Sequence, residues 1–247
     1  MNQTAEVAGR RVVVRAVPAF TIALLLALIG ASASAQVGRI PSGFTPLFNG
    51  RNIDGWHISR TVHHGTTGSY TVGRDGLVMK AHPFGQGGLL LSDQSYQDFE
   101  LYLEANPDPH FNSGIFLRSS EGGSAYQIEL VRPGNTGALL SEQMKLSAPA
   151  YVGERVDINT VWKDGAWNSM RIRMTGEAPR ITLWINDIRM WEAQMPQNDQ
   201  IAGFYGGMIG LQLHWSATYS VAAQGWSGSG APWSVQRFRN LAIRRLN

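Results

Sequence analysis

Apolar and polar residues alternate in short runs along most of the chain after residue 35. In residues 209–216, IGLQLHWS, every second position is apolar, and the positions between them include Gln212 and His214. A period of two puts successive side chains on opposite faces of a strand, so this run predicts a strand with one face in a core. Gln212 and His214 then lie together on the other face, toward water or a ligand.

The same pattern recurs in segments separated by Gly, Pro, Asn and Asp, and no long helical pattern follows residue 35. Strands are predicted at residues 70–73, 77–81, 88–92, 98–105, 113–118, 125–131, 168–175, 180–186, 189–194, 207–215 and 234–246. Several have one apolar and one polar face, which is typical of two antiparallel sheets packed together. The density of strands and turns predicts an all-β sandwich or barrel.

The alternation also predicts which side chains fill the space between the two sheets. We expect a single buried core that contains Trp56, Phe99, Leu101, Ile115, Ile128, Leu130, Ile172, Ile185, Leu211 and Leu213. Gln212 and His214 are expected to point away from this core, because they alternate with Leu211 and Leu213.

The first 35 residues have the composition of an export signal. Arginines precede an apolar run at residues 16–31, and Ala33-Ser34-Ala35 fits a small-residue cleavage site. The apolar run is shorter than the ~20 residues of a spanning helix, which favours cleavage over a membrane anchor. We therefore expect residues 36–247 to form one domain in the periplasm or outside the cell, with no membrane span after cleavage. Sec and twin-arginine export both stay open.

Charge and cysteine content exclude several classes of protein. The chain has 21 Lys and Arg against 18 Asp and Glu, but residues 1–35 hold three arginines and one glutamate, so the remainder is nearly neutral. With no basic run, this balance argues against a nucleic-acid partner. The absence of cysteine excludes disulfides, a lipid-modified cysteine and thiol catalysis.

A set of segments in a fixed order gives the sequence a family resemblance. The segments are FTPLFNGRNIDGW (44–56), GGLLLSDQSYQDFELYLEA (87–105), NSGIFLR (112–118), AYQIEL (125–130), WNSMRIRM (167–174), ITLWIND (181–187), IGLQLHW (209–215) and RFRNLAIRRL (237–246). Together they resemble the 3-keto-disaccharide hydrolase family over about residues 44–246. The resemblance implies a concanavalin A-like jelly roll, in which two curved antiparallel sheets pack together and ligands bind on the concave one.

The resemblance also implies an enzyme that cleaves glycosides whose sugar carries a ketone at C3. The ketone acidifies the hydrogen on C2. After a base removes that hydrogen, the C1 substituent leaves by β-elimination, and water adds back to complete a net hydrolysis. This chemistry needs a base near C2, a positive or hydrogen-bonding group at the C3 oxygen, and an acid at the leaving oxygen. A divalent metal ion can fill the second role as a Lewis acid.

Two residues match family positions that suit proton transfer. His214 follows the family's Ile-Gly-Leu-Gln pattern, and an imidazole with an ordinary pKa of ~6.5 gives or takes a proton at neutral pH, or binds a metal. Glu129, in a Tyr-Gln-x-Glu strand, is the candidate base or metal ligand. A structural alternative stays open for each: a hydrogen-bonded histidine, and a solvated or ion-paired glutamate.

Substrate-binding candidates surround these two residues. Gln127 and Gln212 are expected to hold sugar hydroxyls, and Arg118 to meet the C3 oxygen or to form an ion pair with Glu129. The family usually has Asp-His-Gly after the glutamine, where this chain has Leu213, His214 and Trp215. If that aspartate has a role in relatives, this chain lacks the residue that performs it.

Loop residues supply the remaining candidates. Tyr219 and Trp226 belong to a Gly-, Ser- and Ala-rich stretch at residues 217–232, which is either a connector or a flap over the neighbouring face. His110 is a secondary metal candidate near the start of a strand. The pair His63-His64 lies in a loop and is assigned no role.

Two other functions are compatible with the same fold. A jelly-roll glycosidase needs two carboxylates at one sugar, and Glu100 and Glu104 are the available pair. Four residues along a strand separate them by ~13 Å, more than the ~9.5 Å of inverting enzymes. A non-catalytic carbohydrate-binding module would use the same polar face and aromatic residues.

Overall fold

The computed structural model describes residues 40–81, 86–109, 111–215, 218–220, 225–227 and 234–246. The predicted leader at residues 1–35, His110, and the side chains of Tyr219 and Trp226 lie outside this description. The expectations for them stay predictions. Within the described part of the chain, no helix is long and apolar enough to cross a membrane.

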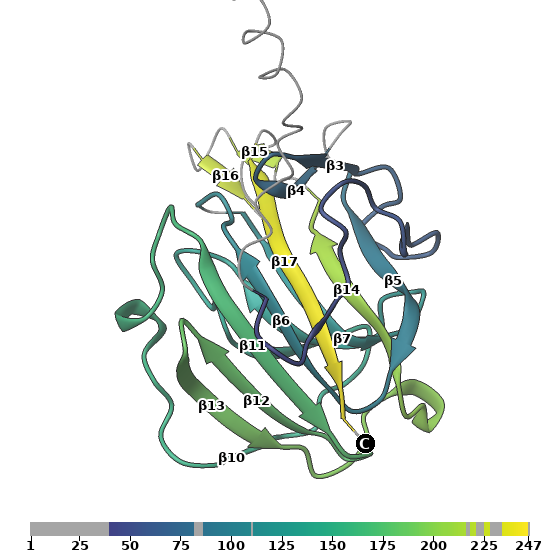
Figure 1. Ribbon diagram of the computed structural model, residues 1–247, viewed down its shortest axis with the longest axis vertical. Helices are drawn as coiled ribbons and strands as arrows, with labels where there is room; N and C mark the ends of the chain where they lie inside the picture. Colours follow the sequence, from purple (N-terminus) through teal and green to yellow (C-terminus); the bar gives the residue numbers. More distant parts are fainter. Residues whose placement is uncertain are drawn as a thin grey trace, which may run out of the picture. The chain divides into compact units, whose positions relative to one another are not determined.

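Two antiparallel sheets pack face to face (Figure 1). The larger has the order β10-β13-β12-β11-β6-β17-β4-β3, with β1 also paired to β17. Its strands are β1 (Thr45–Pro46), β3 (Ser69–Gly73), β4 (Gly76–Lys80), β6 (Phe99–Ala105), β10 (Ala150–Tyr151), β11 (Asn168–Thr175), β12 (Arg180–Ile185), β13 (Ile188–Gln194) and β17 (Val235–Arg245). We call it the nine-stranded sheet.

The smaller, six-stranded sheet has the order β2-β5-β14-β7-β8-β9. Its strands are β2 (Trp56–Ile58), β5 (Gly88–Tyr96), β7 (Ser113–Ser119), β8 (Ala125–Leu130), β9 (Leu139–Glu142) and β14 (Gly207–Leu213). A separate hairpin pairs β15 (Thr218–Ser220) with β16 (Gly225–Ser227). The helical segments of the described residues are two short 3₁₀ turns, η1 (Ile158–Thr160) and η2 (Ile201–Gly203).

The predicted core is confirmed. All ten expected residues are buried in one cluster between the sheets. The eleven predicted strands are all present, most within a residue or two of their expected ends. The strands that the pattern misses, β1, β2, β9 and β10 among them, are two to four residues long, too short to show a period.

The outer face of the six-stranded sheet differs from its expected form. A second apolar cluster of Val62, Leu89, Leu91, Phe116 and Ala125 covers part of it, so this sheet is buried on both faces there. Gly210, on β14, does not open a space for a ligand on this face. A Cβ at that position would lie 2.9 Å from Phe116 Cβ and 3.0 Å from Leu89 Cδ1, so protein side chains fill that space.

Candidate functional site

Strand register brings the polar residues of the outer face into one row. β7 lies between β14 and β8, and Gly114 on β7 is paired with Gln212 on one side and with Glu129 on the other. Gln127 is two residues before Glu129 on β8 and shares its face, because Ile128 between them points into the sandwich core. The alternation therefore predicts correctly that Gln212, Gln127 and Glu129 share one face.

A chain of hydrogen bonds joins these side chains. Gln127 Nε2 donates to Glu129 Oε2 at 2.7 Å and to Gln212 Oε1 at 3.2 Å. Gln212 Nε2 lies 2.9 Å from His64 Nε2. Gln212 is 1% exposed and Glu129 6%, so these groups are not a solvated strand face. They form a buried polar network, in which each amide orients the next.

Gly114 permits this network because it has no side chain. A Cβ there would lie 2.9 Å from both Cγ and Cδ of Gln127, closer than real Cβ contacts allow. The Gln127 side chain thus crosses β7 over the glycine to reach Gln212 on β14. The residues before the glycine also contribute: Ser113 Oγ donates to the Gln212 carbonyl at 2.5 Å, and Asn112 forms a hydrogen bond with Glu129.

Glu129 has a strongly shifted acidity. Burial raises the pKa of its carboxyl from 4.5 to about 7, because the charged form loses its hydration. The hydrogen bond from Asn112 opposes this rise, and the nearby charge of Glu142 adds to it. A carboxyl that titrates near neutral pH is suited to take up a proton and give it back.

His214 is shifted in the opposite direction. Burial lowers its pKa to about 4, with a further lowering by the neighbouring His64, against a hydrogen bond to the Trp215 backbone. His214 Nδ1 lies 3.2 Å from the Trp215 carbonyl oxygen, so it carries the proton and Nε2 the lone pair. The expectation of an imidazole that titrates near its ordinary pKa is therefore wrong: at pH 7 His214 is neutral.

Arg118 does not lie beside Glu129, contrary to the expectation. Its backbone has a φ of 53°, in the left-handed region, opposite a register shift in β14. The guanidinium group turns away and donates to Gln97 O at 2.9 Å, Gly176 O at 2.9 Å and Asp98 Oδ1 at 3.0 Å. With a fully buried side chain, Arg118 joins the turn between β5 and β6 to the turn between β11 and β12.

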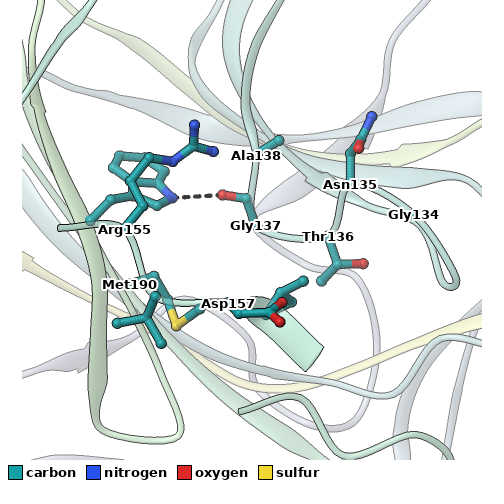
Figure 2. A pocket seen from close by; sticks show the side chains of 11 residues that line it. Gly134, Asn135, Thr136, Gly137, Ala138, Arg155, Asp157 and Met190 are labelled. Atoms are coloured by element: carbon teal, nitrogen blue, oxygen red, sulfur yellow. Dashed lines mark hydrogen bonds between the residues drawn. The ribbon is translucent and has the colours of Figure 1, made fainter. Parts of the chain in front are cut away.

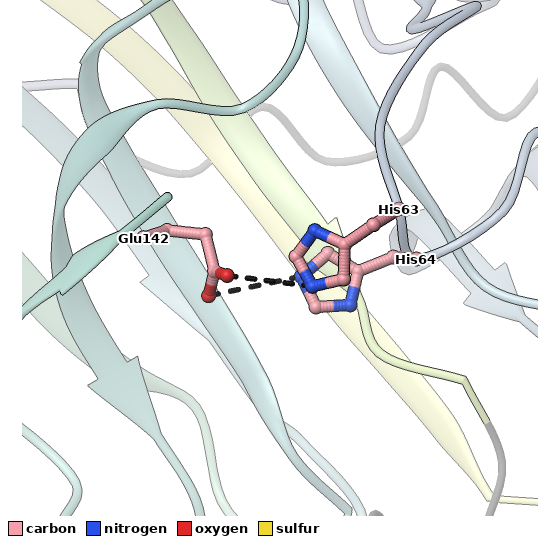
Figure 3. Close-up of side chains that lie close together, drawn as sticks. All are labelled: His63, His64 and Glu142. Carbon is pink, nitrogen blue, oxygen red and sulfur yellow. Dashed lines mark ion pairs between the residues drawn. The ribbon is translucent and has the colours of Figure 1, made fainter. Parts of the chain in front are cut away.

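His63 and His64, which received no role from the sequence, lie at the edge of the hydrogen-bonded row. They come from the loop after β2 and face Glu142 on β9 (Figure 3). His63 Nε2 is 3.4 Å from Glu142 Oε1, and His64 Nε2 is 3.8 Å from Glu142 Oε2. Trp215 stacks on His64 with ring centroids 5.1 Å apart. The adjacent histidines were the available signal, but their partner lies on a strand too short to predict.

These three residues form the group of potential metal ligands that the described part of the chain brings together, with ligand atoms within 4.8 Å of one another. Glu129 faces amides instead, and the His214 ring lies 4.8 Å from the His64 ring. His214 and Glu129, the metal candidates from the sequence that the structure describes, are therefore not part of this group.

A cavity elsewhere in the molecule is less suited to chemistry. It has a volume of about 390 Å³ and lies between residues 134–138, the segment around η1, and β13 (Figure 2). Two of its polar groups have protein partners: Trp191 Nε1 donates to the Gly137 carbonyl at 2.8 Å, and the Asp157 carboxylate accepts from the Asn159 backbone N–H at 3.0 Å. Its described lining includes none of the predicted site residues.

Solved structures with the same fold are known. One is a protein from Parabacteroides distasonis ATCC 8503 assigned provisionally as a glycosyl hydrolase, with 18% identity, a TM-score of 0.52, and coverage of 83% of this chain and 94% of that one. Another is the Crh5 transglycosylase in complex with NAG, with 11% identity, a TM-score of 0.52, and coverage of 84% and 86%. These likenesses define the class of the fold, a concanavalin A-like jelly-roll sandwich.

The sequence also identifies the family. Residues 43–244 match the 3-keto-alpha-glucoside-1,2-lyase-like domain, so the chain belongs to that family. This confirms the resemblance drawn from the ordered segments. No curated protein matches the sequence.

Proposed function

We propose that this protein cleaves the glycosidic bond of 3-keto-glycosides on the outer face of the six-stranded sheet. The observation that carries the proposal is the buried chain of Gln212, Gln127 and Glu129, which presents a carboxyl with a pKa of about 7. Membership of the 3-keto-alpha-glucoside-1,2-lyase-like family supports the substrate class. A ketone at C3 is what makes a base of this modest strength sufficient, because the C2 hydrogen next to it is acidic.

Glu129 is the proposed base. Its carboxylate takes the proton from C2, and the electron pair of that bond forms the enolate of C2 and C3. The enolate then re-forms the C3 carbonyl while a double bond forms between C1 and C2 and the bond from C1 to the leaving oxygen breaks. The leaving oxygen takes up a proton, which the newly protonated Glu129 can return. Addition of water to the double bond completes the hydrolysis.

The other residues of the row have supporting roles in this proposal. Gln127 fixes the Glu129 carboxylate with its amide N–H and is itself held by Gln212. His214, neutral at pH 7, is suited to hydrogen bonding with the sugar rather than to protonating the leaving group. Arg118 is left out of the site, because its guanidinium group is bound to Gln97, Asp98 and Gly176.

The experiment that tests this proposal follows the C2 hydrogen. The full protein is incubated in D₂O with a panel of 3-keto-glucosides and the matching unoxidised glucosides, and the products and C2 deuterium are followed by NMR. We expect release of the aglycone and deuterium at C2 from the keto sugars alone. Binding of these sugars without exchange or cleavage would identify a non-catalytic carbohydrate-binding module. Cleavage of the unoxidised glucosides at equal rate would contradict the elimination chemistry.

A further inference from the structure

Two imidazoles and one carboxylate converge at the end of the hydrogen-bonded row. The Nε2 atoms of His63 and His64 both face the carboxylate of Glu142, at 3.4 and 3.8 Å (Figure 3). In a tetrahedral site with bonds of about 2.0–2.1 Å, ligand atoms lie about 3.3 Å apart. The two histidines approach different oxygens of Glu142, and the three ligand atoms lie within 4.8 Å of one another, so small side-chain rotations would bring them to the spacing of a bound zinc-type ion.

The hydrogen-bonded row also fixes the tautomer of His64. An ionised Glu129 only accepts hydrogen bonds, so Gln127 presents its N–H groups to it and to Gln212 Oε1. Gln212 then presents its amide nitrogen, at 2.9 Å, to His64 Nε2. Facing a donor, this Nε2 carries the lone pair. That is the form of histidine that binds a metal ion.

The opposite nitrogen of His64 does not oppose this tautomer. Nδ1 is buried and has no hydrogen-bond partner among the described residues, although His64 is only 3% exposed. A buried polar group without a partner lowers the stability of the fold. The contact with Gln212 at Nε2 is therefore what sets the tautomer of His64, and it leaves on Nε2 the lone pair that a metal ion can use.

We propose that His63, His64 and Glu142 bind one divalent transition-metal ion of the zinc type through two Nε2 atoms and the carboxylate. Two imidazoles and a carboxylate form a common donor set for such ions, and it leaves a position open for a substrate oxygen. When bound, the ion supplies a Lewis acid for the C3 oxygen. This role in catalysis rests on the proposed function, whereas the binding site does not.

The ion also connects to the proposed base through the same row. It takes the lone pair of His64 that the Gln212 amide contacts in this structure, so Gln212 has to move or rotate on binding. Because Gln212 holds Gln127, and Gln127 holds Glu129, we expect metal binding to shift the pH at which Glu129 titrates.

Metal binding is tested directly on the full chain after treatment with a chelator. Zn²⁺ and Co²⁺ are titrated by calorimetry, and the visible absorption of bound Co²⁺ reports its coordination, with Mg²⁺ as the ion that the site should reject. We expect one equivalent of Zn²⁺ or Co²⁺ per chain. His63→Gln and Glu142→Gln should weaken binding by ~100-fold or more, because each removes a ligand.

A matched control comes from another histidine flanked by acids. His57 Nδ1 lies 2.7 Å from Asp93 and Nε2 2.9 Å from Glu121, with the two carboxylates on opposite sides of the ring. His57→Gln should leave Zn²⁺ binding unchanged. The half-exposed His63 makes His63→Gln a variant with little risk of unfolding, and circular dichroism checks each fold. Wild-type protein that binds no Zn²⁺ or Co²⁺, or variants that bind as tightly as wild type, would overturn the proposal.

Activity measurements separate this proposal from the proposed function. One equivalent of Zn²⁺ bound through these residues, without cleavage of any 3-keto-glucoside, would support the metal site and contradict the function. Cleavage of a 3-keto-glucoside by protein that binds no metal would support the proposed function and contradict the metal site.

Discussion

Both sheets carry carboxylates on their outer faces, but these carboxylates have different partners on the two sheets. On the nine-stranded sheet, Glu104 accepts from Arg239 at 2.6 Å and Glu100 from Arg244 at 2.5 Å. On the six-stranded sheet, Glu129 is held by the amides of Gln127 and Asn112, and no Lys or Arg of the described residues forms an ion pair with it. The Glu129 carboxyl lies among neutral amides, and burial raises its pKa to about 7.

This difference also argues against the glycosidase alternative. Glu100 and Glu104 lie on one strand, β6, but each has its own arginine, and Asn240 also donates to Glu104 at 2.8 Å. These donors already occupy the two carboxylates, and the ~13 Å between residues four apart on a strand is too long for a glycosidase pair. The carboxylates of the nine-stranded sheet are thus held in ion pairs with arginines, and the carboxyl of the six-stranded sheet is the one suited to proton transfer.

The largest expected effect is that of Glu129→Gln on turnover. The amide matches the carboxyl in shape and can still accept from Gln127, but it cannot take a proton at neutral pH. We expect kcat for a 3-keto-glucoside to fall by ~10³-fold, within the range for loss of a general base, with little change in the circular dichroism spectrum. Steady-state kinetics measure this. Turnover within a few-fold of wild type would exclude Glu129 as the base.

Local alternation explains what the sequence could predict of this face. Alternation of apolar and polar side chains depends only on residues that are neighbours in the sequence. It therefore predicted that Gln212, Gln127 and Glu129 lie on one side of the sheet, and that Leu211 and Ile128 lie on the other. It could not show that the face is buried, because the covering cluster includes Val62 from a loop.

Two errors have equally local causes. The Arg118 side chain leaves the face because its backbone φ is 53° beside a bulge, a conformation that alternation does not reveal. The contact of His63 and His64 with Glu142 joins a loop to a distant four-residue strand, so nothing in the sequence near either part indicates it. The expected activity came from the family resemblance, because no contact in the fold specifies a substrate.

His214→Ala tests whether Glu129 alone, or Glu129 together with His214, sets the pH dependence of turnover. Because the pKa of His214 is lowered to about 4, it is neutral across the working range, and the activity should rise with pH through about 7 as Glu129 loses its proton. We expect kcat to fall by ~10²-fold, as for loss of one hydrogen bond to the reacting sugar, while this midpoint stays in place. A midpoint that disappears with the imidazole would assign the titration to His214 instead.

Gly114→Ala tests the hydrogen-bonded row without touching any polar group. The new methyl group displaces the Gln127 side chain, so the contact with Gln212 is lost. Crowding of this kind costs about 1–3 kcal/mol, and we expect turnover to fall by roughly tenfold as Glu129 loses its fixed position. Gly73→Ala on the nine-stranded sheet is the control, because nothing lies within 4 Å of its added Cβ. Thermal melts and kinetics on both variants give the comparison.

Stability as a function of pH measures the burial of Glu129. Its carboxyl binds a proton more tightly when folded, with a pKa of about 7 against 4.5. Its contribution to stability is therefore complete below pH 4.5 and is lost as the pH rises through about 7. At ~1.4 kcal/mol for each step of one in pKa, the loss is roughly 3 kcal/mol at most. Denaturant melts from pH 4 to 8 should show wild type losing stability relative to Glu129→Gln. If the stabilities of wild type and Glu129→Gln change with pH in parallel, the raised pKa of Glu129 is contradicted.

The smallest effect is expected from Glu104→Gln, the same change of charge on the other sheet. Arg239 and Asn240 donate to different oxygens of Glu104, so the single amide oxygen of glutamine can keep one of these two contacts, and the charge is lost. Partly exposed ion pairs contribute about 0–1 kcal/mol, and the arginine keeps its place over the Trp167 ring, 4.2 Å from the centroid. Turnover should equal that of wild type, and the melting temperature should fall slightly or not at all. A loss of turnover close to that of Glu129→Gln would place the reaction on the nine-stranded sheet and remove the distinction between the two faces.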